Sequence, residues 1–192
     1  LDDDDELLED YLKTINENID EKIKWIVIRM IVKNNRGNQT IMPNLKVIQK
    51  QLNNDFFKEL LKISYFTRPT NIIKKEVFQK IGLFLEDLEV AEDYEFILRL
   101  AKNGYKPKII EKPLYIYYIH LGQTTKKYKK FFIAFTKIYK KYKKDIYKHK
   151  DVLSYKYYRL GWYLVYCGEE RKAYKYFKKS FILYPNLKSL IR

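Results

Sequence analysis

The sequence predicts an α/β domain followed by an all-α helical tail. Over the first 125 residues, segments rich in β-branched and aromatic residues alternate with amphipathic helical segments. Beyond residue 125 the strand signals end, and apolar residues recur at steps of three and four. We therefore predict an α/β domain over residues 1–125 and a helical tail over residues 126–192.

Local patterns predict each element of the α/β domain. Acidic residues precede the first helical pattern and favour a helix N-terminus, and Gly82 and Gly104 follow two later helical patterns as stops. Asp93 stands at the start of the last of these helices, a usual place for a capping side chain. In chain order, the expected elements are a helix at 7–19, strands at 24–33 and 39–42, a helix at 45–62, an extended segment at 67–73, helices at 74–81 and 93–103, and a strand at 108–119.

The tail is predicted to contain a long amphipathic helix over 125–146 and a helical pair near 152–167 and 169–183, separated by Gly168. Small residues in this pair would let the two helices approach closely. The pair resembles a single tetratricopeptide unit, and a single unit is expected to pack on other helices instead of forming a solenoid. The positions that carry this likeness are Leu160, Gly161, Gly168, Ala173, Phe177, Ser180 and Pro185.

Charge is unevenly distributed along the chain. The net charge is +15, yet residues 1–21 hold ten acids and one base, which leaves 38 bases against 14 acids in residues 22–192. This balance favours anionic partners. Eleven lysines lie within residues 126–150, so the first tail helix has a cationic face. That face is either an ordinary solvated surface or a site of peripheral docking on an anionic membrane.

The cysteine content and the hydropathy of the sequence indicate the cellular compartment of the protein. The one cysteine, Cys167, has no internal disulfide partner, which fits a reducing compartment. The longest apolar run, residues 25–32, is short and contains Arg29, so no stretch of the sequence is expected to span a bilayer. We therefore expect a cytoplasmic protein, with a peripheral position at the inner membrane face as an extension of that expectation.

Two acidic sites and one histidine are candidate functional groups. Asp2 to Asp5 are consecutive and are followed by Glu6, a set of oxygen ligands that suits Mg²⁺ or Mn²⁺, although an acidic, solvated helix start has the same appearance. Glu92 and Asp93 open the helix at 93–103, where Asp93 is either a simple N-cap or a general base. His120 ends a tyrosine-rich strand, as a structural residue or a metal ligand.

Three segments of residues 1–125 together resemble the second half of glycosyltransferase family 2, whose GT-A fold is Rossmann-like. LDDDDE at 1–6 is similar to the metal motif of the family at a strand end. KKEVFQKIGLF at 74–84 is similar to its acceptor-side helix and loop. EDYEFILRLAKNGYKPKIIEKPLYIYYIH at 92–120 is similar to its catalytic helix and closing strand. The resemblance implies an inverting transfer of sugar from a nucleotide-sugar donor to a glycan, lipid-linked or protein acceptor.

The resemblance also implies roles for individual residues. Asp2 and Asp4 would be the paired aspartates of the metal motif, with Asp4 as the direct ligand, Asp5 close by, and His120 approaching the same Mn²⁺ or Mg²⁺ ion. The metal would neutralise the nucleoside diphosphate as it leaves. Asp2 and Asp4 would thereby also contact the donor.

On the catalytic helix, the resemblance implies that Asp93 is the general base and that Glu92 supports it. Arg99, further along the helix, would face the core or the donor diphosphate. The sequence departs from the family pattern at Leu85 and Glu86, where Asp-Glu is usual. It also lacks the first strands, which hold the donor nucleotide. We therefore expect the chain to be inactive unless that half is supplied in the same polypeptide or by a partner chain.

Two other function classes remain open at this stage. The basic composition, with lysine interleaved with tyrosine, would suit a nucleic-acid-binding protein, but no recognised nucleic-acid motif is present and this function would leave both acidic sites unexplained. A non-catalytic interaction module built on the helical tail is the other alternative.

Overall fold

The computed structural model describes residues 5–34, 36–66, 70–119 and 127–185. The chain forms two compact units, and the boundary between them falls within helix α5 (Glu92–Lys102). The units are Leu1–Phe84 with Phe96–Gln123, and Leu85–Glu95 with Thr124–Arg192. The first unit contains a mixed sheet with helices and the second contains the C-terminal helices, so the predicted α/β class followed by a helical region is confirmed at this level.

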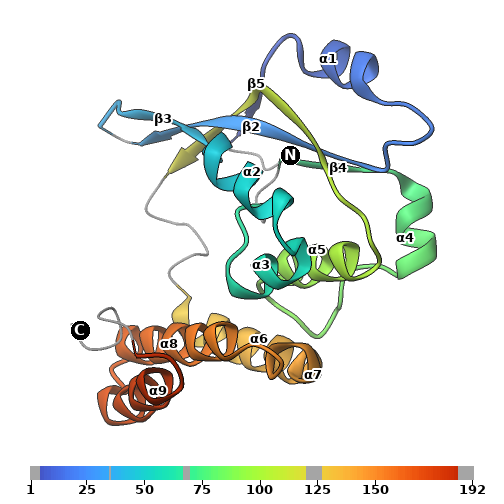
Figure 1. Ribbon diagram of the computed structural model, residues 1–192. Coiled ribbons are helices and arrows are strands. Elements are labelled where there is room, and N and C mark those ends of the chain that lie inside the picture. The colour runs from blue at the N-terminus through green and yellow to red at the C-terminus, as the bar shows by residue number, and fades with distance from the viewer. Residues whose placement is uncertain (1–4, 35, 67–69, 120–126, 186–192) are drawn as a thin grey trace. The chain divides into compact units, whose positions relative to one another are not determined.

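The first unit is organised around a long central strand, β2 (Trp25–Asn34) (Figure 1). On one side β2 pairs in parallel with β5 (Lys108–Ile119), and β5 pairs antiparallel with β1 (Glu6–Leu7). On its other side β2 pairs antiparallel with β3 (Gln39–Met42) and, nearer its start, with β4 (Asn71–Ile73). The parallel pair and the antiparallel flanks make the sheet mixed.

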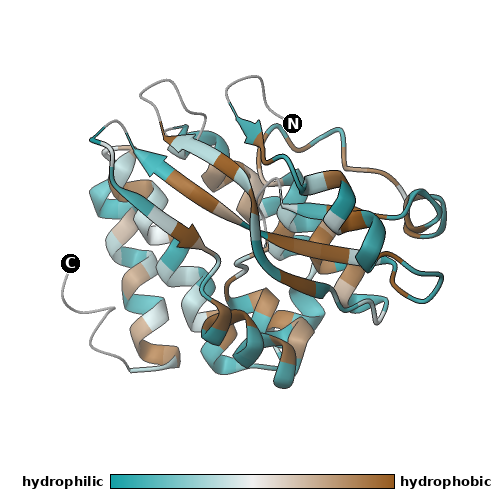
Figure 2. Cartoon of the chain, turned by 90° about the horizontal axis from the view of Figure 1, so that it is seen from above, coloured by the Kyte–Doolittle hydropathy of each residue, from teal (hydrophilic) through white to brown (hydrophobic). Residues whose placement is uncertain are grey.

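Both faces of β2 are buried because its residues are apolar at nearly every position. Ile26, Ile28 and Met30 point to one face, where they form a core with Ile15 of helix α1 (Tyr11–Asn18). On the opposite face, the Trp25 ring contacts two phenylalanine rings with centroids about 6 Å away. Figure 2 shows the hydrophobic residues in brown along the central strands.

Two predicted helices of the first unit differ from the structure by more than one residue at an end. The helix expected at 7–19 begins only at Tyr11, because Glu6 and Leu7 pair with β5 as a strand. The helix expected at 45–62 is two helices, α2 (Leu45–Asn53) and α3 (Phe56–Lys62). The break occurs because the Asp55 side chain accepts a hydrogen bond from the backbone N–H of Lys58, which starts a new helix.

Helix α4 (Lys75–Ile81) ends at Gly82, as the sequence predicted. Gly82 has a φ of +87°, a left-handed conformation that glycine adopts without a steric penalty. The Phe78 ring of α4 stacks on the Phe96 ring of α5 with centroids 4.6 Å apart. This contact anchors α4 to α5 within the first unit.

The second unit contains the helices predicted for the tail, namely α6 (Tyr128–Lys141), α7 (Lys143–Ile146), α8 (Lys150–Tyr166) and α9 (Glu170–Leu183). The single long helix expected over 125–146 is interrupted at Tyr142, where the backbone leaves the helical conformation. The turn between α8 and α9 contains Gly168 with a φ of +75°, at the position that the sequence predicted.

Helices α8 and α9 approach closely at Gly161. A Cβ atom added there would lie 2.6 Å from Cε1 of the Phe177 ring, far inside a normal contact. Leu164, Ala173 and Phe177 form the buried core of this helical pair. In the part of the chain that the structure describes, no helix is long and apolar enough to cross a membrane.

Candidate functional site

The first turn of α5 carries the candidate general base, Asp93, beside Glu92. Its Oδ1 accepts a hydrogen bond from the backbone N–H of Tyr94 at 2.7 Å. The pKa of the Asp93 carboxyl is raised to about 7, mainly by burial and to a smaller extent by the nearby charge of Glu92, while hydrogen bonds from backbone N–H groups partly oppose the shift. A carboxyl with a pKa near neutrality is suited to accept and release a proton at physiological pH.

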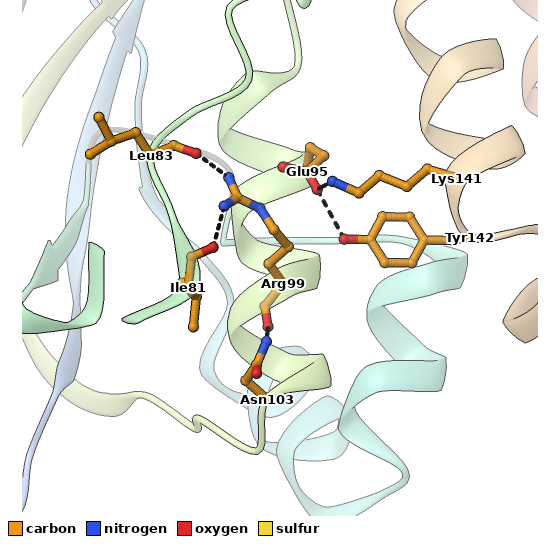
Figure 3. A network of polar contacts seen from close by, with 7 residues as sticks. All are labelled: Ile81, Leu83, Glu95, Arg99, Asn103, Lys141 and Tyr142. Atoms are coloured by element: carbon orange, nitrogen blue, oxygen red, sulfur yellow. Dashed lines mark hydrogen bonds and ion pairs between the residues drawn. The ribbon is translucent and has the colours of Figure 1, made fainter. Parts of the chain in front are cut away.

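Glu95, two residues after the candidate base, connects this turn to the C-terminal helices of the same unit. Its side chain is fully buried, and Oε1 accepts hydrogen bonds from Lys141 Nζ at 2.7 Å and from the Tyr142 hydroxyl at 3.0 Å (Figure 3). A buried carboxylate requires such partners, because removing its charge from water without compensation is costly. The pairing therefore fixes the start of α5 against the end of α6.

Tyr94 provides a second link between α5 and the helices of the second unit. Its ring is buried, and its hydroxyl accepts a hydrogen bond from Lys156 Nζ of α8 at 3.0 Å. Burial lowers the pKa of the Lys156 amine well below its usual value, and the neighbouring Arg159 cation lowers it further. The Lys156 nitrogen also lies 4.3 Å from the centroid of the Tyr139 ring, a cation–π arrangement whenever the amine is protonated.

Arg99 lies on α5 in the first unit, where it holds the turn that follows α4. Nη1 donates to the Ile81 carbonyl at 2.7 Å and Nη2 donates to the Leu83 carbonyl at 2.6 Å (Figure 3). The guanidinium also lies 4.8 Å from the centroid of the Phe96 ring. Through these contacts Arg99 binds the turn after α4 in its own unit.

Asp5 is the one residue of the predicted metal set that the structure describes. It is buried, and its Oδ2 accepts a hydrogen bond from the Tyr115 hydroxyl at 2.5 Å while Oδ1 accepts one from the Tyr118 backbone N–H at 3.1 Å. Both donors belong to β5, so Asp5 is attached to that strand. Among the described residues, no group of three or more His, Cys, Asp or Glu side chains is close enough to hold a metal ion.

The remaining predicted site residues divide into two groups. Glu92 and Asp93 share the first turn of α5, which begins at Glu92, one residue before the predicted start, so Asp93 lies inside the helix and is not its N-cap. Arg99 belongs to the later part of that helix. Asp2, Asp4 and His120 lie outside the described residues. Their predicted contacts with a metal or with the donor diphosphate therefore stay predictions.

The residues that hold the start of α5 were not among the predicted site residues. Glu95 lies four residues after Ala91 and three before Leu98, both buried, so it is a carboxylate within an apolar helical stripe. Lys156 is flanked four residues away on either side by the buried residues Val152 and Leu160. A charged residue at an apolar helical position was the signal available in each case.

Comparison with family models, with curated proteins and with solved structures finds no match to this chain.

Proposed function

We propose that this chain is the catalytic and acceptor-binding half of an inverting glycosyltransferase with a partial GT-A fold, in which Asp93 is the general base. The observation that carries this proposal is the Asp93 carboxyl at the start of α5, whose pKa is raised to about 7 mainly by burial. An ordinary solvated N-cap aspartate gains no such shift, because water stabilises its charged form.

The proposed reaction is a single displacement. The hydroxyl oxygen of a glycan, lipid-linked or protein acceptor attacks the anomeric carbon of a nucleotide-sugar, and its proton passes to the Asp93 carboxylate. The bond between the anomeric carbon and the diphosphate oxygen breaks, and the nucleoside diphosphate leaves with the electron pair. Attack opposite to the leaving group inverts the anomeric centre.

The positions of Glu95 and Tyr94 support this role for Asp93. Both residues connect the first turn of α5 to helices of the second unit through hydrogen bonds of 2.7–3.0 Å. A general base must be held within hydrogen-bond reach of the proton that it removes, so a rigid first turn favours catalysis. We infer that the helical region positions the base.

In this proposal a divalent cation would supply the positive charge that neutralises the leaving diphosphate. Asp2, Asp4 and His120 are the proposed ligands, and the paired aspartates are proposed to act on the donor side, whereas Arg99 is proposed to hold the turn after α4. Both Asp5 oxygens accept hydrogen bonds from β5, so we assign Asp5 the role of positioning the acidic segment beside the proposed metal.

The test is a transfer assay with a panel of nucleotide-sugars and Mn²⁺, with the donor-binding half supplied in the same polypeptide or separately. We expect release of nucleoside diphosphate to rise with pH through about 7, as Asp93 loses its proton. Asp93→Asn should lower the rate by about 10²- to 10⁴-fold, the usual contribution of a general base.

Glu111→Gln is the matched control, because Glu111 is an exposed carboxylate on β5. Its rate should equal that of the unmodified protein. A folded Asp93→Asn variant that retains full transfer activity would overturn the assignment of the base, and a complete lack of transfer with every donor would overturn the enzyme proposal.

A further inference from the structure

The second unit contains a groove with a cavity volume of about 530 Å³, lined by residues of α6, α9 and the end of α8. Its apolar floor includes Phe132 of α6 and Tyr176 of α9, whose rings meet edge to face with centroids 6.1 Å apart. Leu164 closes the floor at the end of α8, and Ile133 is 48% exposed at its side. The floor thus combines aromatic and aliphatic surface from three helices.

Lysines surround this floor on both sides. Lys129 stands on α6, and Lys172, Lys175 and Lys179 follow one another on one face of α9 at steps of three and four residues. The one acidic side chain of the lining, Glu169, forms an ion pair with Lys172 at 3.0 Å. No described carboxylate forms an ion pair with Lys129 or Lys175, so the rim carries a net positive charge.

We propose that this groove is a docking site for an acidic amphipathic segment of a partner protein, with apolar side chains on the floor and carboxylates against the lysines. An occupant of this kind complements both features, because it removes apolar surface from water and neutralises the rim. The proposal concerns a surface distinct from Asp93 and does not depend on the proposed catalytic activity.

The shape of the groove favours a protein segment over a membrane surface or a nucleic acid. A peripheral helix enters a bilayer with apolar side chains that protrude below its charged residues, whereas here the apolar residues lie in a hollow between the lysines. A phosphate backbone would satisfy the lysines but leave the apolar floor uncovered. A helical peptide with one apolar stripe and acidic flanks satisfies both parts of the surface.

The experiment measures binding of a fluorescein-labelled helical peptide of about four turns, with leucine along one face and glutamate on its flanks, by fluorescence polarisation. The test variant combines Lys129→Glu with Lys175→Glu, one lysine from each side of the groove. The control combines Lys140→Glu with Lys178→Glu, exposed residues of the same two helices that lie outside the groove, so the change in charge is identical.

We expect the test variant to bind the peptide at least tenfold more weakly, and the control to stay within about threefold of the unmodified protein. Ile133→Ser should also weaken binding, with little effect on folding because the side chain is half exposed. Equal losses in the test and control variants would overturn the proposal, since they would indicate general charge attraction. So would equal binding of a peptide with serine in place of leucine.

Vesicles of phosphatidylglycerol form the second arm of the experiment. Co-sedimentation that the Lys129/Lys175 variant abolishes, together with no binding of the peptide, would identify the surface as a membrane site and overturn the proposal. Peptide binding that depends on the groove, with vesicle binding equal in the test and control variants, would support it.

Discussion

The Glu95 carboxylate is fully buried and accepts a hydrogen bond from Lys141 Nζ at 2.7 Å, across 46 positions of sequence. Lys141 itself is 42% exposed, so its charge remains partly hydrated while it compensates the buried carboxylate. The two residues therefore differ in how much the fold depends on each charge. Removing Lys141 leaves the buried Glu95 carboxylate with fewer partners, whereas Lys141 itself can be hydrated.

We predict that Lys141→Met lowers the free energy of unfolding by about 1–3 kcal/mol, the usual cost of depriving a buried charged group of a hydrogen bond. Glu95→Gln should cost less, because a neutral amide is cheaper to bury and still accepts a hydrogen bond from Tyr142. Urea unfolding of the two single variants and the double variant measures the coupling. Additive effects would contradict a direct interaction.

Arg99 is predicted to act through the turn after α4. In Arg99→Lys, a single ammonium group cannot reproduce the two separate donors that reach Ile81 and Leu83, so we expect a loss of about 1–2 kcal/mol in the free energy of unfolding. Amide exchange at residues 82–84 should become faster in the variant. Unchanged exchange there, measured by mass spectrometry, would show that the turn is held by other contacts.

The elements that depend on neighbouring residues could be predicted from the sequence. Those that depend on pairing between residues far apart in the sequence could not. The strand at Lys108–Ile119 and the glycine stops at Gly82 and Gly104 are signalled by a few neighbouring residues, and the structure confirms them. By contrast, strand β1 exists only because Glu6 and Leu7 meet Ile116 and Tyr115, more than a hundred positions away. A two-residue strand has no periodicity to read.

The candidate site was likewise predictable only in its local features. Asp93 could be identified because it lies in the first turn of a helix, which is a local feature. The environment of Asp93 could not be predicted from the sequence, because its pKa near 7 depends on burial in the folded chain. The first turn of α5 is also held by Lys156, which contacts the Tyr94 hydroxyl from 62 positions away in the sequence. Sequence reasoning therefore found the candidate base but not the residues that position it.

The raised pKa of Asp93 predicts a specific pH dependence of stability. The group binds its proton more tightly in the folded state, with a pKa of about 7 against a reference value of 3.8. Protonated Asp93 therefore contributes to the free energy of unfolding, and this contribution is fully present below about pH 3.8 and is lost as the pH rises toward 7. The loss is at most about 4 kcal/mol, because each unit of pKa difference corresponds to about 1.4 kcal/mol.

Asp93→Asn removes this ionisation and keeps an oxygen that can accept the hydrogen bond from Tyr94. We expect the variant to gain stability over the unmodified protein between pH 4 and pH 8, with the difference largest at pH 8. Urea unfolding at several pH values measures the gain. Parallel stability curves for the two proteins would show that the Asp93 pKa is not raised.

Replacement of Gly161 is predicted to destabilise the fold because of its close contact with Phe177. The Cβ of an alanine would lie 2.6–3.0 Å from three atoms of the Phe177 ring, so α8 and α9 would have to separate or the ring would have to move. We expect Gly161→Ala to lower the free energy of unfolding by about 1–3 kcal/mol, a typical cost of overpacking, which would exceed the gain in helix propensity from alanine.

A second substitution distinguishes this steric cause from a general effect on α8. Phe177→Leu removes part of the ring that the new methyl group would meet, so Gly161→Ala should cost less in that background than in the unmodified protein. Thermal or urea unfolding of the four proteins in this cycle gives the interaction energy. If alanine at 161 costs the same in both backgrounds, the close approach of α8 and α9 does not depend on the Phe177 ring.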